Sequence, residues 1–471
     1  MRKATKNQWI LFTCVAILYI LFVVWDGNYW LLFGIPVIFD IYISKLIPWG
    51  AWKNTGNHAL RKVAEWVDAI VFALVAVYLI NLFIFQNYKI PSSSLEKTLL
   101  VGDYLFVSKV SYGPRVPNTP LSFPLTQHTL PVVNTKSYIE WPKWDYKRLK
   151  GFGNVKRNDI VVFNFPAGDT VARKMENPDY YYLAKKIGRE TLRSHGARYG
   201  EIIYRPVDRR ENYVKRCVGM PGDNFRIIHN EIYINGKKQA APPKAQFNYF
   251  VETNGELWND KMFRMLDVRS GDFGLFGEPV LLEEIGIQRN ENGLFNPVYL
   301  MPLTQESLQK LQKGNLCRSI HPETDELLEK HPEIFGPSDD IYPYDADFGW
   351  SRDNYGPLWI PKKGTAIPLD EKNLALYSHC IVNYEGNTLQ KSGNRILING
   401  KAADSYTFKY DYYFMMGDNR HNSRDSRSWG FVPEDHVVGK PILVWLSLDD
   451  DRGWFNGKIR WKRIFRNVSA D

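Results

Sequence analysis

The chain has 471 residues, a net charge of +9 at neutral pH and an apolar fraction of 44%, so it is long enough for more than one domain of ordinary size. Its 27 Tyr, 26 Phe and 15 Trp favour strands and wet apolar surfaces over a purely helical bundle. The positive charge suits an anionic membrane surface better than nucleic acid, because no zinc-finger spacing, RNA-binding signature or long basic block accompanies it.

Three apolar segments occupy the first ninety residues. Residues 9–25 follow several basic residues, and no small-x-small cleavage site comes after them, so we expect a retained span and not a cleaved signal. Residues 31–49 are interrupted by proline and charge, whereas residues 69–85 form a strong candidate span. The sequence predicts a membrane anchor over residues 1–88 with two to three transmembrane helices.

Basic residues set the expected orientation of this anchor. They lie before the first apolar run and between the second and the third: Arg2, Lys3, Lys6, Lys53, Arg61 and Lys62. Basic loops stay in the cytoplasm. We therefore predict a multi-pass protein of the cytoplasmic (inner) membrane, with everything after residue 85 on the outer, periplasmic or extracytoplasmic, side.

Short segments of strand length follow the anchor. They are residues 104–110, 159–165, 213–218, 225–234, 395–398 and 441–446. Two similar stretches, 231–237 and 395–401, each carry Asn-Gly after a β-rich run, which is the strongest short signal for a hairpin. The pattern predicts a mainly β region with two such hairpins.

Two longer stretches lack this strand pattern. Residues 113–150 contain six prolines and are expected to form an extended loop or flap. Residues 240–390 are rich in Pro, Gly, Asn and charge, with helix-like patterns at 305–313 and 324–330. They predict an inserted subdomain or cap.

The four cysteines are Cys14, Cys217, Cys317 and Cys380, with no CxxC pair among them. This spacing argues against a disulfide framework or a zinc site. A single Cys317–Cys380 disulfide in an oxidising compartment is an alternative that the sequence leaves undecided.

Three consecutive serines end at Ser94, just after Pro91 and the third apolar run. Taken alone, these hydroxyls are best explained as caps of a turn or helix start. A serine acts as a nucleophile only with a base within hydrogen-bond reach and a stabilised oxyanion. None of the nine histidines stands in an evident triad context, so a lysine with a depressed pKa is the alternative base.

Lys215 is the candidate base, because it lies in an apolar strand segment. Alternation puts Tyr213, Lys215 and Cys217 on one face, which leaves Arg216 to find a carboxylate elsewhere. In isolation, a solvated lysine at a strand edge explains the segment as well. The polar loop 417–433 follows an apolar strand and indicates either a network that supports a site or a surface turn with Asp–Arg pairs.

Together these segments resemble the signature boxes of type I signal peptidases (leader peptidases). The family's serine box, Pro-Ser-x-Ser-Met-x-Pro-Thr-Leu, is similar to residues 91–99, and residues 213–223 match its lysine box, Tyr-x-Lys-Arg-x-x-Gly-x-Pro-Gly-Asp, in full. Residues 417–433 match its Gly-Asp-Asn-Arg box, and residues 158–166 look like its core strand. This sequence departs from the family at three positions, with Leu95 for Met, Lys97 for Pro and His421 for Asp.

The resemblance implies a serine endopeptidase with a Ser-Lys dyad that removes signal peptides from exported preproteins, without a cofactor or metal. Residue by residue, it makes Ser94 the nucleophile, Lys215 the general base and Ser423 the group that orients Lys215. The Ser92 hydroxyl and the Ser94 backbone N–H would form the oxyanion hole. The supporting residues would be Asp418, Asp425 and Arg427.

The resemblance also implies shallow substrate pockets for small residues three and one before the cut. Candidates to line them are Ile90, Pro91, Leu95, Leu99, Tyr213 and Val214, with ordinary core packing as the alternative for each. The predicted fold class is mainly β, with an antiparallel or barrel-like catalytic core, N-terminal transmembrane helices and an inserted α+β subdomain. The catalytic core is expected at 89–235 and 395–471, and the inserted cap subdomain at 236–394.

Three other functions compete with this interpretation. A non-catalytic membrane-anchored binding protein on the same scaffold would have no reason to keep Ser94, Lys215 and Ser423 together. A self-cleaving Ser-Lys regulator would not need the membrane spans, and a nucleic-acid binder would show salt-sensitive DNA binding. We expect the partners to be preproteins and the lipid bilayer, with no nucleic acid and no obligate protein partner.

Overall fold

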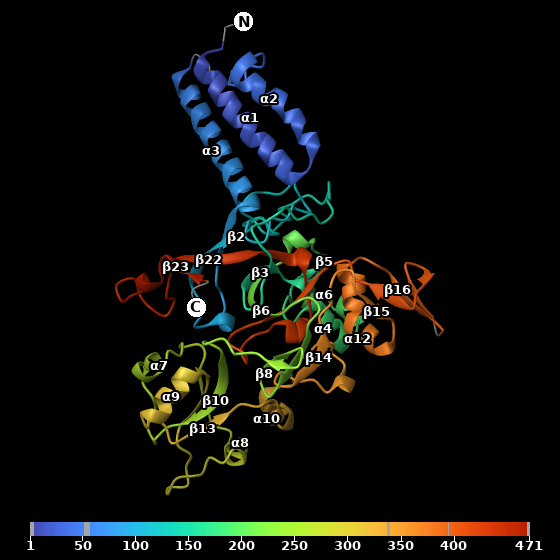
Figure 1. Ribbon diagram of the computed structural model, residues 1–471. Coiled ribbons are helices and arrows are strands. Elements are labelled where there is room, and N and C mark those ends of the chain that lie inside the picture. The colour runs from blue at the N-terminus through green and yellow to red at the C-terminus, as the bar shows by residue number, and fades with distance from the viewer. Residues whose placement is uncertain (1–3, 51–56, 337–339, 394, 469–471) are drawn as a thin grey trace.

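The computed structural model describes residues 4–50, 57–336, 340–393 and 395–468. Arg2, Lys3 and Lys53, which contribute to the predicted orientation, lie outside the described residues. Figure 1 shows three helical segments packed side by side and projecting from a body rich in β-strands.

Two of these segments are long and apolar enough to cross a membrane, judged by length and composition: α1 (Lys6–Asp26) and α3 (His58–Phe83). The weaker second apolar segment forms a shorter broken helix made of η1 (Tyr29–Gly34), α2 (Ile35–Phe39) and η2 (Asp40–Ser44). At about 1.5 Å per residue it extends roughly 24 Å. It ends where the Asp40 carboxylate accepts hydrogen bonds from the backbone N–H groups of Leu46 and Ile47.

An eight-stranded antiparallel sheet forms the body next to these helices, in the order β1-β2-β22-β3-β6-β20-β21 with β23 also paired to β22. Its strands are β1 (Phe85–Lys89), β2 (Asp103–Ser108), β3 (Ile160–Asn164), β6 (Asn212–Gly219), β20 (Tyr412–Met416), β21 (Val432–Pro433), β22 (Val437–Ser447) and β23 (Arg466–Asn467). The predicted mainly β fold with N-terminal apolar helices is confirmed.

The central strands of this sheet are buried on both faces. In β3, Val161 and Phe163 pack in one cluster around Trp429, while Ile160 and Val162 pack in another around Leu99. This alternation follows from the period of two along a strand. The loops and turns that leave these strands therefore start from a densely packed, largely dry sheet.

A second group of elements packs in its own core behind β20. It includes β7 (Asn224–Ile228), β8 (Glu231–Ile234), β14 (Tyr355–Trp359) and α12 (Glu371–His379), and the exposed strand β9 (Lys237–Lys238) pairs with β8 at the edge of the sheet. Both predicted Asn-Gly hairpins form, between β8 and β9 and between β17 (Arg395–Ile398) and β18 (Lys401–Ala402). Asn235 and Asn399 have positive φ (51° and 52°), as such tight turns require.

A four-stranded sheet with helices lies at the far end of the body from the helical bundle (Figure 1). It consists of β10 (Gln246–Glu252), β11 (Gly274–Phe276), β12 (Val298–Thr304) and β13 (Ser319–Pro322), with α7 (Asp260–Met265), α8 (Pro279–Glu284), α9 (Gln305–Lys313), α10 (Asp325–Lys330) and α11 (Pro332–Phe335). The helices predicted at 305–313 and 324–330 are confirmed, with Thr304 and Thr324 as N-caps.

The remaining α-helices and β-strands are short. They are β4 (Thr170–Ala172), β5 (Ile202–Tyr204), β15 (Ala366–Pro368), β16 (Leu389–Ser392), β19 (Ser405–Thr407), α4 (Tyr180–Ile187), α5 (Arg189–Ser194), α6 (Gly196–Tyr199) and α13 (Ser426–Trp429). Residues 113–150 carry only isolated bridges, as an extended loop should. Cys317 and Cys380 are both free thiols and pack against different core clusters.

Candidate active site

Lys215 lies within β6, between β3 and β20 in the sheet. It pairs with Val161 of β3 and is only 3% exposed. Tyr213 and Cys217, on the same face of the strand, pack with the cluster around Trp429. The strand therefore delivers the lysine amine into a largely dry interior.

Ser94 lies in the single turn of 3-10 helix that follows β1, η4 (Ser93–Leu95), and is 7% exposed. Lys215 Nζ donates a hydrogen bond to Ser94 Oγ at 2.6 Å, although the two residues are 121 positions apart in the chain. The structure thus brings together the two residues that the sequence predicts as nucleophile and base.

Burial lowers the pKa of Lys215 to about 8, because the charged ammonium loses its water. Asp425 and Asp418 oppose this by raising the pKa, and Arg427 lowers it further. The group in direct contact with Nζ is a neutral hydroxyl and not a carboxylate. Near pH 8 the amine is therefore neutral in a large fraction of molecules.

Asp418 connects β6, the strand that carries Lys215, to residues 93–98, the serine turn that carries Ser94. Its carboxylate accepts two hydrogen bonds from the Arg216 guanidinium, at 2.8 and 2.7 Å, and one from Thr98 Oγ1 at 2.8 Å. Arg216 follows Lys215 on β6, and Thr98 lies four residues after Ser94. Asp418 is 0% exposed. Arg216, on the opposite face of β6 from Lys215, was expected to find a carboxylate elsewhere, and Asp418 is that partner.

Asn419 contacts the serine turn directly, a role that the sequence patterns did not single out. Its backbone N–H donates to the Ser94 carbonyl at 3.1 Å, and its Nδ2 donates to the Ser93 carbonyl at 3.3 Å. The preceding Gly417 is packed so closely that a methyl group there would collide with the Ser94 carbonyl and with Ser423. The only available signal was the position of Asn419 in the Gly-Asp-Asn-Arg box.

Ser423 does not make the expected hydrogen bond to Lys215. Its Oγ is buried and has no hydrogen-bond partner within the described part of the chain. The hydroxyl lies against Gly417, close to the Ser94 carbonyl. The expectation is wrong for this conformation, in which the lysine amine is directed at Ser94 Oγ.

Asp425 and Arg427 form a buried ion pair with an N–O distance of 2.8 Å. Asp425 also accepts from the Gly417 N–H at 3.0 Å, and Arg427 donates to the Arg420 carbonyl at 2.6 Å. Through these hydrogen bonds the pair links the beginning, middle and end of the loop from Gly417 to Arg427. It supports the loop, and within the described residues its hydrogen bonds go to Gly417 and Arg420 and not to Ser94 or Lys215.

The residues predicted to line substrate pockets fall into two groups. Ile90, Leu95 and Leu99 are at most 3% exposed and belong to one core cluster, to which Val214 adds a partly buried side chain. For the three buried residues, the structure therefore favours the alternative of core packing. Tyr213 packs partly buried in the opposite cluster.

Pro91 and Ser92 remain exposed immediately before the serine turn. The Ser92 backbone is extended (φ −132°, ψ 157°), and its side chain does not cap the turn. The Ser92 hydroxyl is therefore accessible from outside the core.

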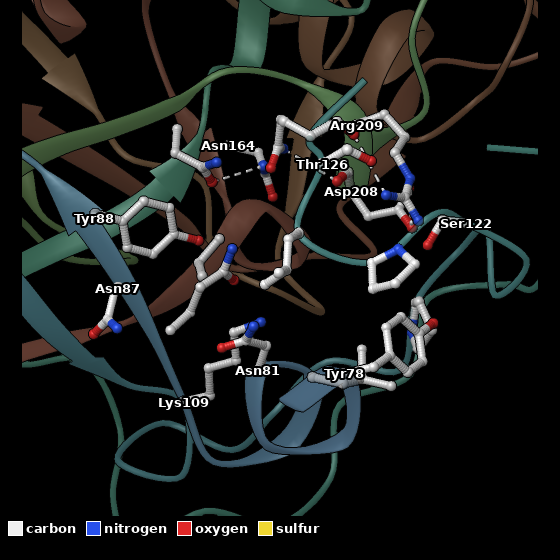
Figure 2. A pocket seen from close by; sticks show the side chains of 18 of the residues that line it. Tyr78, Asn81, Asn87, Tyr88, Lys109, Ser122, Thr126, Asn164, Asp208 and Arg209 are labelled. Carbon is white, nitrogen blue, oxygen red and sulfur yellow. Dashed lines mark hydrogen bonds and ion pairs between the residues drawn. The ribbon is translucent and has the colours of Figure 1, made fainter. Parts of the chain in front are cut away.

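A cavity of about 760 Å³ opens next to Pro91, between the end of α3, β1 and the loop that follows β2. Figure 2 shows Asn81 of α3 and Lys109 on the opposite side of this cavity from Asn164 of β3 and Asp208. The lining mixes apolar and polar groups, as ligand sites do. Within the described ranges, no group of three His, Cys, Asp or Glu side chains is arranged to hold a metal ion.

Comparison with known proteins gives one consistent family. A family model described as "Signal peptidase, peptidase S26" matches residues 63–278 and 370–446. Signal peptidase I of Buchnera aphidicola subsp. Baizongia pistaciae is 23% identical over 427 residues, which cover 90% of this chain and 89% of the relative. Signal peptidase I of Haemophilus influenzae is 20% identical over 416 residues, covering 87% and 77%, and that of Helicobacter pylori is 22% identical over 425 residues, covering 87% and 95%.

Proposed function

The chain belongs to the signal peptidase family, peptidase S26, and from this premise we propose that it is a membrane-anchored serine endopeptidase that removes signal peptides from exported preproteins. Ser94 is the nucleophile and Lys215 the general base. The observation that carries this proposal is the buried contact of 2.6 Å between Lys215 Nζ and Ser94 Oγ. A lysine held at a serine hydroxyl without a carboxylate in contact is poised to act as a base.

The reaction begins with neutral Lys215. As Ser94 Oγ attacks the scissile carbonyl carbon, Nζ accepts the hydroxyl proton and becomes an ammonium. That proton then passes to the leaving amine as the C–N bond breaks, which releases the mature protein and leaves the signal peptide esterified to Ser94. Lys215, neutral again, takes a proton from a water that attacks the ester, and the ammonium returns that proton to Ser94 Oγ as the signal peptide leaves with a free carboxyl group.

The negative oxygen formed in each addition step needs hydrogen-bond donors. We assign this role to the Ser94 backbone N–H and the Ser92 hydroxyl. The exposed, extended position of Ser92 just before the turn supports the assignment. The contacts of Asn419 with the Ser93 and Ser94 carbonyls support it as well, because they hold the peptide groups of the turn in one orientation.

The two long apolar helices would anchor the enzyme in the membrane. The end of α1 meets the body, where Trp25 Nε1 donates to the Lys150 carbonyl at 2.9 Å, and α3 continues almost directly into β1. Both helices therefore have their C-terminal ends on the side of the catalytic sheet (Figure 1). Lys6 and Arg61 lie near the other ends, which supports a cytoplasmic N-terminus and an outer catalytic region.

The cavity beside Pro91 supports a substrate path from the membrane to Ser94. A signal peptide leaving the bilayer along α3 would meet this cavity before it reached the serine turn. We propose that its last residues lie extended there, with small side chains three and one before the cut. The crowded serine turn, with Leu95 and Ile90 already buried, leaves little room for larger side chains.

The direct test is cleavage of a purified preprotein by the full chain in detergent. With alanine three and one before the cut, we expect a single new N-terminus at the mature sequence, detected by mass spectrometry. The matched substrate with phenylalanine one before the cut should be cut at least tenfold more slowly. Binding without cleavage of the alanine substrate would favour the non-catalytic alternative.

The pKa of Lys215, lowered to about 8, predicts a pH dependence of the rate. Only the neutral amine accepts the Ser94 proton, so kcat/KM should rise with pH, approaching tenfold per unit well below pH 8, and level off above it. Initial rates between pH 6 and pH 10 test this. A rate that stays constant across pH 8 would contradict Lys215 as the base.

A further inference from the structure

The four-stranded sheet β10–β13, inside the predicted inserted subdomain, touches the loop that holds the serine turn. We infer that this sheet positions residues 417–427, the catalytic loop, and that His421 is the positioning residue through which it does so. The inference rests on the proposed function, because its main readout is the rate of cleavage. It gives a role to a part of the chain in which the sequence shows no catalytic motif.

The first contact is made by the backbone of Gln246, the first residue of β10. Its N–H donates to the Asp418 carbonyl at 3.0 Å, and its carbonyl accepts from the Arg420 N–H at 2.9 Å. These two hydrogen bonds bracket Asn419, whose own N–H donates to the Ser94 carbonyl. The strand β10 therefore fixes the orientation of the Asn419 backbone, which in turn holds the Ser94 carbonyl.

The second contact involves His421, whose side chain is 1% exposed. Its Nδ1 accepts a hydrogen bond from the Asn248 backbone N–H at 3.2 Å and lies 3.6 Å from Glu323 Oε1, beyond hydrogen-bond distance, and its Nε2 lies 3.1 Å from Asp353 Oδ1. Because Nδ1 is an acceptor, the proton of the neutral ring is on Nε2, which donates to the Asp353 carboxylate. His421 thus bridges β10 and the segment before β14 with one acceptor and one donor.

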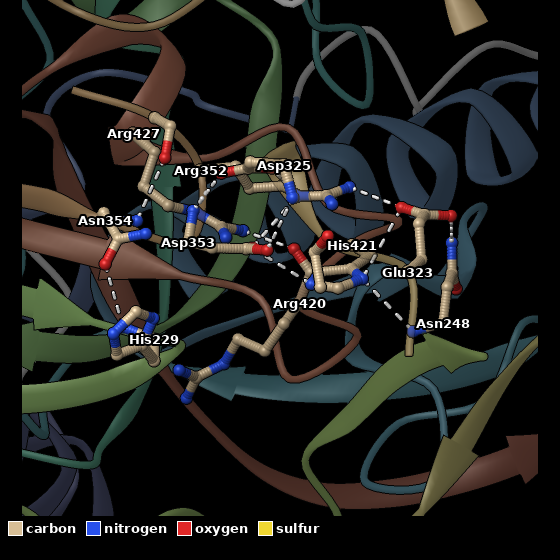
Figure 3. Close-up of polar contacts among 12 residues, drawn as sticks. His229, Asn248, Glu323, Asp325, Arg352, Asp353, Asn354, Arg420, His421 and Arg427 are labelled. Carbon is tan, nitrogen blue, oxygen red and sulfur yellow. Dashed lines mark hydrogen bonds and ion pairs between the residues drawn. The ribbon is translucent and has the colours of Figure 1, made fainter. Parts of the chain in front are cut away.

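His421 contacts a largely buried cluster of charged side chains through Asp353 (Figure 3). Arg352 pairs with three carboxylates, with Glu323 at 2.9 Å, Asp325 at 3.1 Å and Asp353 at 3.3 Å. Burial would raise the pKa of Asp353, but the hydrogen bond from His421 and the charge of Arg352 act to lower it. A histidine that donates to this cluster fits it, whereas a further carboxylate would be repelled.

The serine turn has a separate contact with the same subdomain. Lys97 Nζ lies 3.3 Å from Asp267 Oδ2, with the lysine side chain 7% exposed and the aspartate 78% exposed. Lys97 and His421 are two of the three positions at which this chain departs from the family's boxes. Both of these residues therefore contact the inserted subdomain. Lys97 does so from the serine turn and His421 from the catalytic loop.

The test replaces His421 with aspartate, the residue usual in the family, and with asparagine, which has the same shape without the charge. We expect His421→Asp to lower kcat about 100-fold and His421→Asn about tenfold, with KM within twofold, since small displacements of reacting groups cost rate and not binding. Adding Asp353→Asn to His421→Asp removes one carboxylate and supplies a donor. This double variant should recover at least tenfold in kcat.

His331→Asn is the matched control. His331 also lies in this subdomain and contacts two carboxylates, Glu284 and Glu333, but these contacts are away from the catalytic loop. It should keep kcat within twofold. Thermal unfolding of each variant identifies misfolded protein, and His421→Asn carries the test if His421→Asp does not fold.

Wild-type kcat in folded His421→Asp, or no recovery in the double variant, would overturn the inference and leave the proposed function standing. An inactive wild type in the same assay would instead count against the proposed function. A drop in both His421→Asn and His331→Asn would indicate a general loss of stability of the subdomain, which contradicts a specific role of His421.

Discussion

Replacing Lys215 with methionine is expected to lower kcat/KM for preprotein cleavage by about 10³-fold or more, because the Ser94 hydroxyl then has no base to take its proton. Methionine fills a similar buried volume and carries no charge. Ser94→Ala should have the same effect, and the double variant should be no worse than either single one, since the two groups act as a unit. Initial rates with the alanine preprotein measure these losses.

Lys440→Met is the control for this prediction. Lys440 lies on β22 of the same sheet, and its Nζ is 2.6 Å from Asp159 Oδ1, away from Ser94. Its loss should change kcat/KM by no more than about threefold, since a partly exposed ion pair contributes at most about 1 kcal/mol. Cleavage at the normal rate by Lys215→Met would remove the Ser-Lys mechanism, whatever the control shows.

Replacing Asp418 with alanine is expected to destabilise the fold by about 3–5 kcal/mol, because it leaves the buried Arg216 guanidinium without its carboxylate. Asp418 is 0% exposed and accepts three hydrogen bonds, from Arg216 and Thr98. The variant should also lose activity in the folded fraction, since the base strand and the serine turn are joined through this side chain. Denaturant unfolding measures the first effect and cleavage rates the second.

The matched control is Glu283→Ala, which breaks an exposed ion pair with Arg289 at 3.0 Å. Such a pair contributes about 0–1 kcal/mol, so the unfolding midpoint should hardly move. Equal shifts in the two variants would show that burial of the Asp418–Arg216 pair does not determine its contribution.

Much of the local structure was predictable from the chain. The strands around Lys215, the two Asn-Gly hairpins and the helix at 305–313 form where the patterns indicated. These features depend on neighbours within a few residues, on turn chemistry and on capping. The second apolar segment was less predictable, because its length is limited by the hydrogen bonds of one carboxylate, Asp40, to the chain that follows it.

The candidate site was predictable in its members but not in all of its contacts. Motif matching brought out Ser94, Lys215 and Asp418, and the chain folds so that Lys215 contacts Ser94 while Asp418 contacts Thr98 and Arg216 beside them. It also implied a bond from Ser423 to Lys215 that is not formed. It did not point to Asn419, whose contact with Ser94 uses its backbone N–H and is independent of its side chain.

The apolar helices, the alternating strands and the chemical groups available for catalysis could be identified from residue order, because each is encoded in residue types at short spacing. The folded chain was needed to establish that Lys215 is 3% exposed and lies 2.6 Å from a hydroxyl 121 residues away, and that β10 and His421 contact the loop beside it. Burial and distance depend on which distant segments pack together. The pKa of a lysine follows from that packing and not from its neighbours in the chain.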